Sequence, residues 1–150
     1  MLKAEEQKRI WEAAFEAYKK SAETGYFLGQ YELGYCYYYG ICVGQSYTEA
    51  VKWFRLAADQ KYVKAQDFHG NCYYHGRGVD ESYTEAVKLY RLAAEQGHAV
   101  AQNNLGLCYE NGRGVPKSES EAIKWYKMSA KQGYEFAIDN LKSRGIYEYD

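Results

Sequence analysis

Apolar residues recur at a helical spacing along most of the chain. Between Ala86 and Ala94, apolar side chains occupy positions i, i+1, i+4, i+7 and i+8, which is the pattern of a helix that buries one face. Further helices are predicted over Phe27–Tyr39, Val63–His75 and Ala99–Asn111, and a glycine directly follows each of them. No segment predicts a strand. The pattern of apolar and polar positions therefore predicts an all-α protein.

The helical pattern repeats with a period of 36 residues. Gly34, Gly70 and Gly106 are separated by this step, and stepping back from Phe54 leads to Tyr18. A fixed period of about 20–50 residues is typical of arrays in which each unit stacks on the next. Three copies are present, with a partial copy at each end. Other positions recur at the same step: Cys36, Cys72 and Cys108; Tyr37, Tyr73 and Tyr109; Ala50, Ala86 and Ala122; Ala65, Ala101 and Ala137.

Each copy predicts a hairpin of two antiparallel helices. A serine three positions ahead of a glutamate matches the S-x-x-E capping box at the start of the second helix, and a glycine stands where that helix should end. Because one hairpin is too small to bury its apolar face, stacking must supply the core. The serines are Ser46, Ser82 and Ser118; the glycines are Gly25, Gly97 and Gly133, with Lys61 in the remaining copy.

We expect one continuous domain over residues 1–150, folded as a right-handed α/α solenoid of antiparallel helix hairpins with 36-residue repeats. Small residues such as Gly34, Ala58 and Ala65 would let helix backbones approach one another. Larger side chains would fill the space between helices: Tyr37, Trp53, Phe54 and Leu56. The expected units are a half-unit or capping helix over 1–26, full repeats over 27–62, 63–98 and 99–134, and a capping helix and tail over 135–150.

The repeated residues read A-x-x-x-L-G-x-x-Y-x-x-G-x-G-V followed by A-x-x-W/L-Y-x-x-A-A-x-x-G. This pattern resembles the Sel-one-like repeat (SLR) family, which is related to tetratricopeptide repeats. The copy from Ala101 to Gly133 fits closely, and the copy before it places His69 at the Leu position. The first copy departs in its turn, where Cys42 stands at a glycine position. If that position needs a positive φ, either Cys42 is strained or this loop bends differently by using Gly44. The resemblance implies an α/α superhelix that acts as a protein-interaction scaffold, with no shared enzymatic activity.

Composition and charge narrow the class of partner. Charged residues make up 26% of the chain and hydrophobic ones 47%, and the aromatic fraction of 17% is dominated by 18 tyrosines. A net charge of −1 gives no general attraction to nucleic acid or to an acidic membrane. The first 20 residues do not match a secretory signal, and no apolar run approaches the roughly 20 residues that cross a bilayer. We expect a cytoplasmic, monomeric protein that binds a protein or peptide, without nucleic acid, membrane insertion or a cofactor.

The glycine-rich turns and the cysteines resemble functional motifs but favour structural roles. A phosphate loop needs a strand before it and a Gly-Lys-Ser/Thr ending, and the Gly-Arg-Gly-Val turns have neither, so a turn is the favoured interpretation. Cys36, Cys72 and Cys108 fall on equivalent helices about 9–10 Å apart, beyond disulfide reach, and are expected to be core residues. A pairing of Cys42 with Cys36 or Cys72 stays open.

No catalytic or metal-binding constellation is predicted. His69, His75 and His98 lack a partnered nucleophile or carboxylate at a recognisable spacing, and a core or groove role is expected for His69 and His75. No C-x-x-C or His/Cys cluster predicts zinc. Two alternatives to the scaffold are a self-associating structural array and the weak β-lactam activity that the resemblance to cysteine-rich relatives suggests. We therefore expect a non-enzymatic protein.

Positions that differ between copies mark the candidate binding surface, because a core must repeat whereas a recognition surface need not. On the first helix of each hairpin these positions share one face at spacing i, i+4, i+7, which by resemblance to tetratricopeptide arrays lines the concave side. We expect a segment held by stacking on tyrosines and by hydrogen bonds from Asp67, Asn71 and Asn103; tolerant surface positions are the alternative. The trios are Tyr31, Tyr35 and Tyr38; Asp67, Asn71 and Tyr74; and Asn103, Leu107 and Glu110, extended by Asp139 and Ser143 and rimmed by Tyr39, His75 and Asn111.

Overall fold

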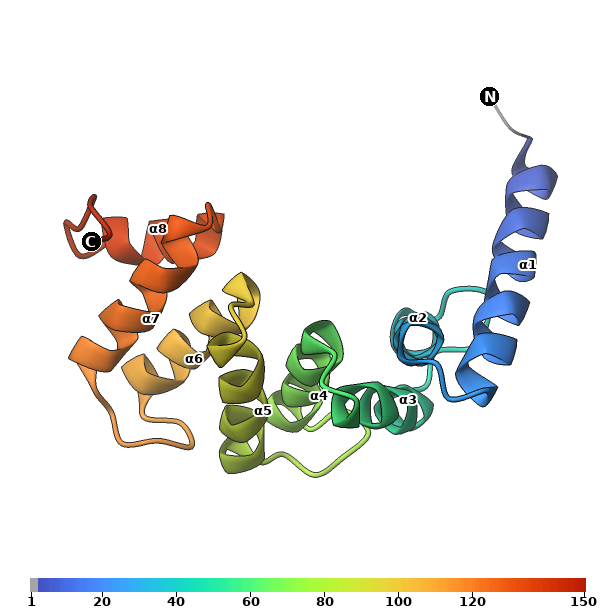
Figure 1. The fold of residues 1–150 in the computed structure, drawn as a ribbon, viewed down its shortest axis with the longest axis horizontal. Coiled ribbons are helices and arrows are strands. Elements are labelled where there is room, and N and C mark those ends of the chain that lie inside the picture. Colours follow the sequence, from blue (N-terminus) through green and yellow to red (C-terminus); the bar gives the residue numbers. More distant parts are fainter. Residues whose placement is uncertain (1–2) are drawn as a thin grey trace.

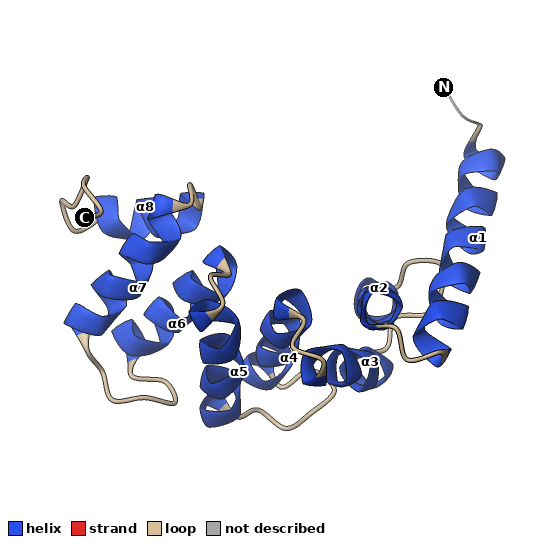
Figure 2. Cartoon of the chain, viewed as in Figure 1, coloured by secondary structure: helices blue, strands red, loops and turns tan. Residues whose placement is uncertain are grey.

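The regular elements that the structure describes are all helices. The computed structural model describes residues 3–150, and within them it contains eight α-helices and no strand (Figure 2). The prediction of an all-α fold is therefore confirmed. The helices are α1 (Ala4–Glu23), α2 (Phe27–Tyr39), α3 (Tyr47–Asp59), α4 (Val63–His75), α5 (Tyr83–Glu95), α6 (Ala99–Asn111), α7 (Glu119–Lys131) and α8 (Glu135–Lys142).

Consecutive helices pack against one another and form a solenoid of helix hairpins. The helices follow an arc, with α1 at one end and α7 and α8 at the other (Figure 1). The even-numbered helices α2, α4, α6 and α8 lie along the inner side of this arc, and the odd-numbered helices lie along the outer side. Residues on the inner helices are therefore placed where a concave surface forms.

The serine caps form at the start of the outer helices. The Ser46, Ser82 and Ser118 hydroxyl oxygens each accept a hydrogen bond at 3.2 Å from the backbone N–H three residues later. The reciprocal half of the predicted box differs, because the carboxylates of Glu49 and Glu85 are 2.9 Å from Lys52 Nζ and Lys88 Nζ, respectively. The lysine three residues after each glutamate thus pairs with its exposed carboxylate, in place of the backbone N–H that a complete capping box would use.

The helix ends use the left-handed backbone conformation. Gly40, Gly76 and Gly112 end the inner helices with φ between 63° and 68°. Lys61 has a φ of 68° where the other copies place a glycine, and it is one of two non-glycine residues with positive φ among those described. A side chain in this conformation costs about 1–2 kcal/mol, which makes this end less stable than its glycine counterparts.

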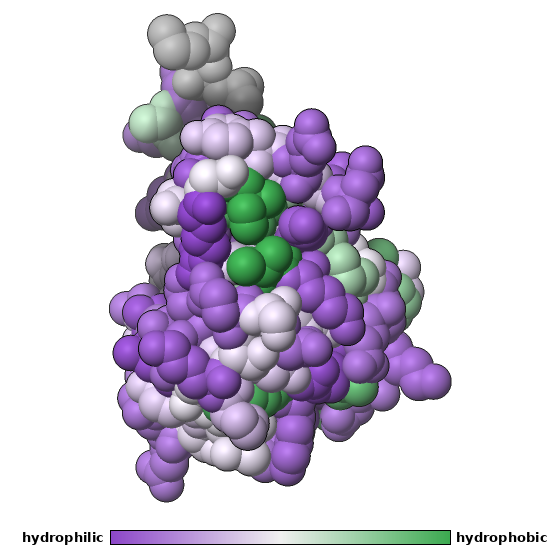
Figure 3. Space-filling view, turned by 90° about the vertical axis from the view of Figure 1, so that its left-hand side faces the viewer, coloured by the Kyte–Doolittle hydropathy of each residue, from purple (hydrophilic) through white to green (hydrophobic). Residues whose placement is uncertain are grey.

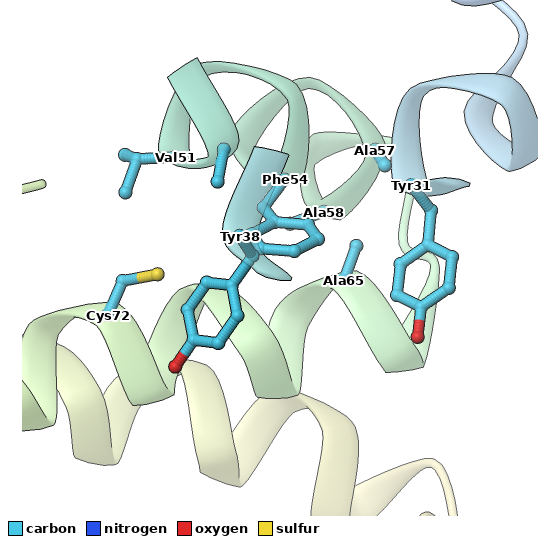
Figure 4. Close-up of a cluster of buried hydrophobic side chains, with 9 residues drawn as sticks. Tyr31, Tyr38, Val51, Phe54, Ala57, Ala58, Ala65 and Cys72 are labelled. Atoms are coloured by element: carbon cyan, nitrogen blue, oxygen red, sulfur yellow. The ribbon is translucent and has the colours of Figure 1, made fainter. Parts of the chain in front are cut away.

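Small residues allow the two helices of a hairpin to approach closely. A Cβ added to Gly34, Gly70 or Gly106 would lie 2.6–2.8 Å from the ring of Phe54, Tyr90 or Tyr126, respectively. These three rings are at most 2% exposed, and the predicted close approach is confirmed. Figure 4 shows Phe54 between helices with Tyr38, Ala58 and Ala65 around it.

One predicted core position is wrong. Leu56 is 44% exposed, and its equivalent Leu92 is 49% exposed. In the first full copy the buried stripe of α3 includes Phe54, Ala57 and Ala58, and Leu56 lies outside it. Single exposed leucines of this kind are common on protein surfaces.

Each Gly-Arg-Gly-Val turn joins the two helices of one hairpin and contacts the hairpin before it. The Arg77 guanidinium donates to the Tyr38 hydroxyl and lies 5.5 Å from the centre of the Tyr47 ring. A Cβ on Gly78 would overlap the backbone carbonyl of Tyr47. Arg113 and Gly114 make the equivalent contacts with Tyr74 and Tyr83.

The first copy departs from this turn. Its turn has Ile41 and Cys42 at the Arg and Gly positions, and Cys42 has a φ of 60°. Within the described residues α1 precedes this hairpin, and Ile41 lines a hollow together with α1 residues, whereas the Cys42 side chain is exposed. Of the two alternatives, the structure shows the positive φ at Cys42 that Gly78 and Gly114 have in the other copies.

The C-terminal end of the array is largely polar. Figure 3 looks onto this end and shows a small hydrophobic area surrounded by hydrophilic residues. Ile146 and Tyr149 of the tail pack against the cluster formed by α7 and α8, which includes Tyr126 and Leu141. Among the helices that the structure describes, none is both long and apolar enough to cross a membrane.

Candidate partner-binding groove

Two adjoining depressions lie along the inner helices. The first has a volume of about 290 Å³ and is formed by α2, α4 and the start of α6. The second has a volume of about 180 Å³ and is formed by α4, α5 and α6. Asn71 lines both of them, so they follow one another along the concave side. We call this pair of depressions the groove.

Tyrosine and amide side chains dominate the groove. Tyr31, Tyr38, Tyr39, Asp67 and Asn71 line the first depression. Asn71, Tyr74, His75 and Leu107 line the second one. The structure thus gathers eight of the residues that the copy-to-copy differences indicated into one continuous surface.

Four of the predicted partner-binding residues are buried and not exposed. Tyr31, Tyr38, Asp67 and Asn103 are at most 8% exposed, whereas the sequence prediction placed them on a face open to a partner. The cause is the close packing of neighbouring inner helices. Phe68 lies 5.9 Å from Tyr31 and 5.5 Å from Tyr38, ring centre to ring centre. The burial of these four side chains corrects the prediction.

Amide side chains connect successive inner helices at the same level. Asn104 Nδ2 donates to Asp67 Oδ1 at 3.0 Å, and Asn140 Nδ2 donates to Asn103 Oδ1 at 3.1 Å. Asn103 lines neither depression. Asn71 is engaged too, since its Oδ1 accepts a bond of 2.6 Å from the Tyr90 hydroxyl.

The remaining predicted residues lie beside the groove. Tyr35 stacks on Tyr39 at 4.6 Å and lines a separate hollow between α1 and α2. Glu110 is paired with Arg144 and accepts from the Tyr126 hydroxyl, so its carboxylate belongs to the contact between α6 and the tail. Asn111, Asp139 and Ser143 are exposed and line neither depression.

Sequence reasoning missed several groove residues. His98, Lys64 and Phe68 also line the first depression, and Tyr90 and Asn104 line the second. A signal for His98 exists in the sequence, because it follows Asp67 by 31 residues, as Tyr62 follows Tyr31. The Tyr31 and Tyr62 rings are 5.2 Å apart, and His98 Nε2 is 3.9 Å from Asp67 Oδ2.

Burial sets the protonation of the groove. Loss of hydration raises the pKa of the Asp67 carboxyl to about 6, although the hydrogen bond from Asn104 acts in the opposite direction. Burial and the nearby Lys64 ammonium lower the pKa of His98. At neutral pH the first depression therefore contains an ionised carboxylate beside a neutral imidazole.

The buried cysteines and His69 are core residues. Burial raises the pKa of Cys36 and Cys108 to about 11 and that of Cys72 to about 12, so these thiols stay protonated at neutral pH. His69 is 7% exposed, and neither ring nitrogen has a hydrogen-bond partner. All four cysteines are free in the structure, and Cys42 is exposed. Across residues 3–150, no group of three or more His, Cys, Asp or Glu side chains could hold a metal ion.

Two larger hollows lie elsewhere, where residues 145–150 meet α7. They have volumes of about 470 and 450 Å³; Lys127 lines both of them, and Tyr149 lines the smaller one. None of the residues predicted to bind a partner lines them. The groove is thus the place where sequence variation between copies and surface shape coincide.

The repeat positions on which this geometry depends match a known family model. The model is described as the Sel1 repeat, and it matches residues 28–62, 63–98 and 99–134. The chain belongs to the Sel1 repeat family. No curated protein matched the chain in the corresponding search.

Solved Sel1 repeat structures share the fold. A protective antigen of uropathogenic Escherichia coli that displays an SLR fold is 36% identical with a TM-score of 0.83. The match includes 91% of this chain and 30% of that protein. A Sel1 repeat protein from Oxalobacter formigenes has the same identity and TM-score, and 91% of this chain spans 58% of it. Cysteine-rich protein B of Helicobacter pylori is 21% identical with a TM-score of 0.69 over 89% of this chain and 96% of that one. The chain thus spans about a third to three fifths of the first two proteins.

Proposed function

We propose that this protein is a non-enzymatic scaffold that binds an extended or helical protein segment in the groove. Membership of the Sel1 repeat family, whose members are generally protein-interaction scaffolds, supports this role. The observation that carries the proposal is the pair of adjoining depressions, in which residues that differ between copies line one surface. A repeated core explains the conserved spacing of the copies, but it does not explain these differences.

The chemistry of the groove suits a peptide backbone with apolar side chains. Tyr39 is 51% exposed and offers an aromatic face together with a hydroxyl group. Tyrosine loses little conformational entropy on binding, which is why it is enriched in recognition surfaces. Asn104 and His75 add polar groups to the wall of the second depression. The two depressions together would hold successive side chains of one segment.

A Tyr39→Ala variant tests this role. Peptides are selected from a random displayed library against the parent protein, and their dissociation constants are then measured by fluorescence polarisation. We expect Tyr39→Ala to weaken the selected peptides at least about tenfold, which corresponds to roughly 1.4 kcal/mol, because an exposed aromatic anchor is lost.

Tyr26→Ala is the matched control for this measurement. Tyr26 is 50% exposed, close to the value for Tyr39, and lines neither depression. The Tyr26→Ala variant should bind the peptides as the parent does. Equal affinities for all three proteins would show that the peptides bind outside the groove. Asn71→Ala is unsuitable, because it would leave the buried Tyr90 hydroxyl without its acceptor.

A further inference from the structure

The carboxylate of Asp67 is not needed for the contact that it makes. In the next copy, Asn103 takes the same place and accepts the equivalent hydrogen bond from Asn140 with a neutral amide oxygen. Asn104 donates to Asp67 Oδ1 in the same way. An amide therefore suffices to connect neighbouring inner helices, and the negative charge at position 67 has no role in that contact.

This charge is placed where it destabilises the protein. The Asp67 side chain is 5% exposed, and burial of an ionised carboxylate is unfavourable unless a cation compensates it. Its second oxygen, Oδ2, has no hydrogen bond in the structure. Buried polar groups that break the packing rules in this way are found at functional sites.

The residues around Asp67 do not neutralise it. His98 Nε2 lies 3.9 Å from Oδ2, but burial and Lys64 hold the imidazole in its neutral form at neutral pH. Lys64 lines the same depression without an ion pair to Asp67 among the described contacts. The carboxylate thus belongs to the lining of a hollow of about 290 Å³ and has no ion pair with a lysine or arginine among the described residues.

Aromatic rings form the wall of the same hollow. Tyr31, Tyr38 and Tyr39 line it together with Phe68, and the centre of the Phe68 ring is 5.5–6.3 Å from those of the three tyrosines. The faces of aromatic rings attract cations, and this attraction increases when water is excluded. A carboxylate beside tyrosines is a combination that suits an ammonium or a guanidinium group.

We propose that the first depression binds the cationic end of a lysine or arginine side chain carried by the partner segment, with Asp67 as its counter-ion and the tyrosines as its wall. This inference rests on the proposed function, because it names the chemistry of one contact within the groove. A neutral side chain at this place would leave the buried carboxylate uncompensated and would be rejected.

Small cations test the site without a known partner. n-Butylammonium and n-propylguanidinium chlorides are titrated into the 15N-labelled protein, with 1-butanol and sodium acetate as neutral and anionic comparisons. We expect the cations to shift the amide resonances of residues around Asp67 and His98, with saturable binding. We expect Asp67→Asn to weaken cation binding at least tenfold. We expect 1-butanol to bind the parent protein no more tightly than the cations bind the Asp67→Asn variant.

Asp139→Asn is the matched control, because Asp139 is the exposed equivalent of Asp67 and lines neither depression. It should bind the cations as the parent does. The proposal is wrong if Asp67→Asn retains cation binding. It is also wrong if acetate shifts these resonances and the cations do not, because the hollow would then bind an anion at Lys64 and His98. Replacing lysine by norleucine in a selected peptide gives a second readout on the unaltered protein, and tenfold weaker binding is expected.

These outcomes separate the inference from the function on which it rests. If Tyr39→Ala weakens the selected peptides but neither Asp67→Asn nor the norleucine replacement does, the groove binds peptides and the cation site is refuted. If cations bind at Asp67 but Tyr39→Ala leaves peptide binding unchanged, the cation site stands and the groove is not the place where peptides bind.

Discussion

The second full repeat carries buried polar side chains at positions where its neighbours are apolar or neutral. His69 stands at the position of Leu33 and Leu105, both at most 1% exposed, and neither of its ring nitrogens has a partner. Asp67 stands at the position of Asn103. At the scale of single residues, therefore, replacing such a side chain by the residue of a neighbouring copy should stabilise this repeat.

Replacing His69 by leucine should stabilise the protein. The change removes an unpaired buried polar group, which costs about 1–3 kcal/mol, and installs the residue that both neighbouring copies use. Urea unfolding followed by circular dichroism measures the free energy of unfolding. A variant that is less stable than the parent at pH 7.5 would mean that the imidazole makes a contact absent from the structure.

The same variant separates a pH effect. Burial, together with the charge of Arg55, lowers the pKa of His69 to about 4 from its ordinary value of 6.5. The unfolded chain therefore binds more protons between these values, and the parent loses stability as pH falls from about 6.5 to 4. Asp67 acts in the opposite direction, since its raised pKa favours the folded state at low pH. The stability advantage of His69→Leu should accordingly grow as the pH is lowered through this window.

At the scale of elements, the hairpin is set by a glycine opposite an aromatic ring. Gly106 of α6 faces Tyr126 of α7, and a Cβ there would lie 2.6 Å from the ring and 3.3 Å from the Ala122 carbonyl oxygen. The Tyr126 ring is fully buried and cannot move aside without opening the hairpin. The same geometry recurs in the other two hairpins, which explains the period of this glycine.

Gly106→Val should separate α6 from α7. A valine adds three carbons to a contact without free space, and overpacking of this kind costs about 1–3 kcal/mol or more. Hydrogen exchange should show loss of protection in α6, α7 and α8, and circular dichroism should show reduced helicity. Gly97→Val provides the comparison, because Gly97 has no heavy atom within 4 Å of its added Cβ. Equal effects of the two changes would show that the close contact at Gly106 costs no more than the backbone strain at Gly97.

At the scale of the whole molecule, the turns couple one hairpin to the next. Gly114 lies against the backbone of Tyr83, and Arg113 contacts the rings of Tyr74 and Tyr83, all in the preceding hairpin. In a repeat array, stability is approximately the sum of the repeats and of the interfaces between neighbours. The cooperativity of unfolding therefore depends on such contacts.

Gly114→Ala should weaken this coupling. The added Cβ would overlap the Tyr83 carbonyl, and the residue has a φ of 73°. The urea transition should broaden or divide, with the part around α6–α8 unfolding first. Gly97→Ala carries only the conformational cost of about 1–2 kcal/mol at its φ of 92° and should keep a single transition. A sharp single transition for Gly114→Ala would show that the turn contact does not couple the hairpins.

The sequence alone determined the helices and their repetition. The 36-residue step placed α2, α4 and α6 at the residues where the structure has them, because small residues, caps and aromatic positions recur together. It also indicated the helix face on which the groove lies. The order of elements follows from local pattern, since helix propensity, capping and apolar spacing are properties of neighbouring residues.

Only the tertiary structure decided which of the groove residues are exposed. Tyr31 and Asp67 belong to the same face as Tyr39, yet they are buried because Phe68, His98 and Asn104 come from the next helices in the array. Burial depends on how closely two repeats approach, and no local pattern contains that distance. The proposed role of the Asp67 charge in binding a cation likewise depends on surroundings that exclude water and include tyrosine rings, and only the tertiary structure provides them.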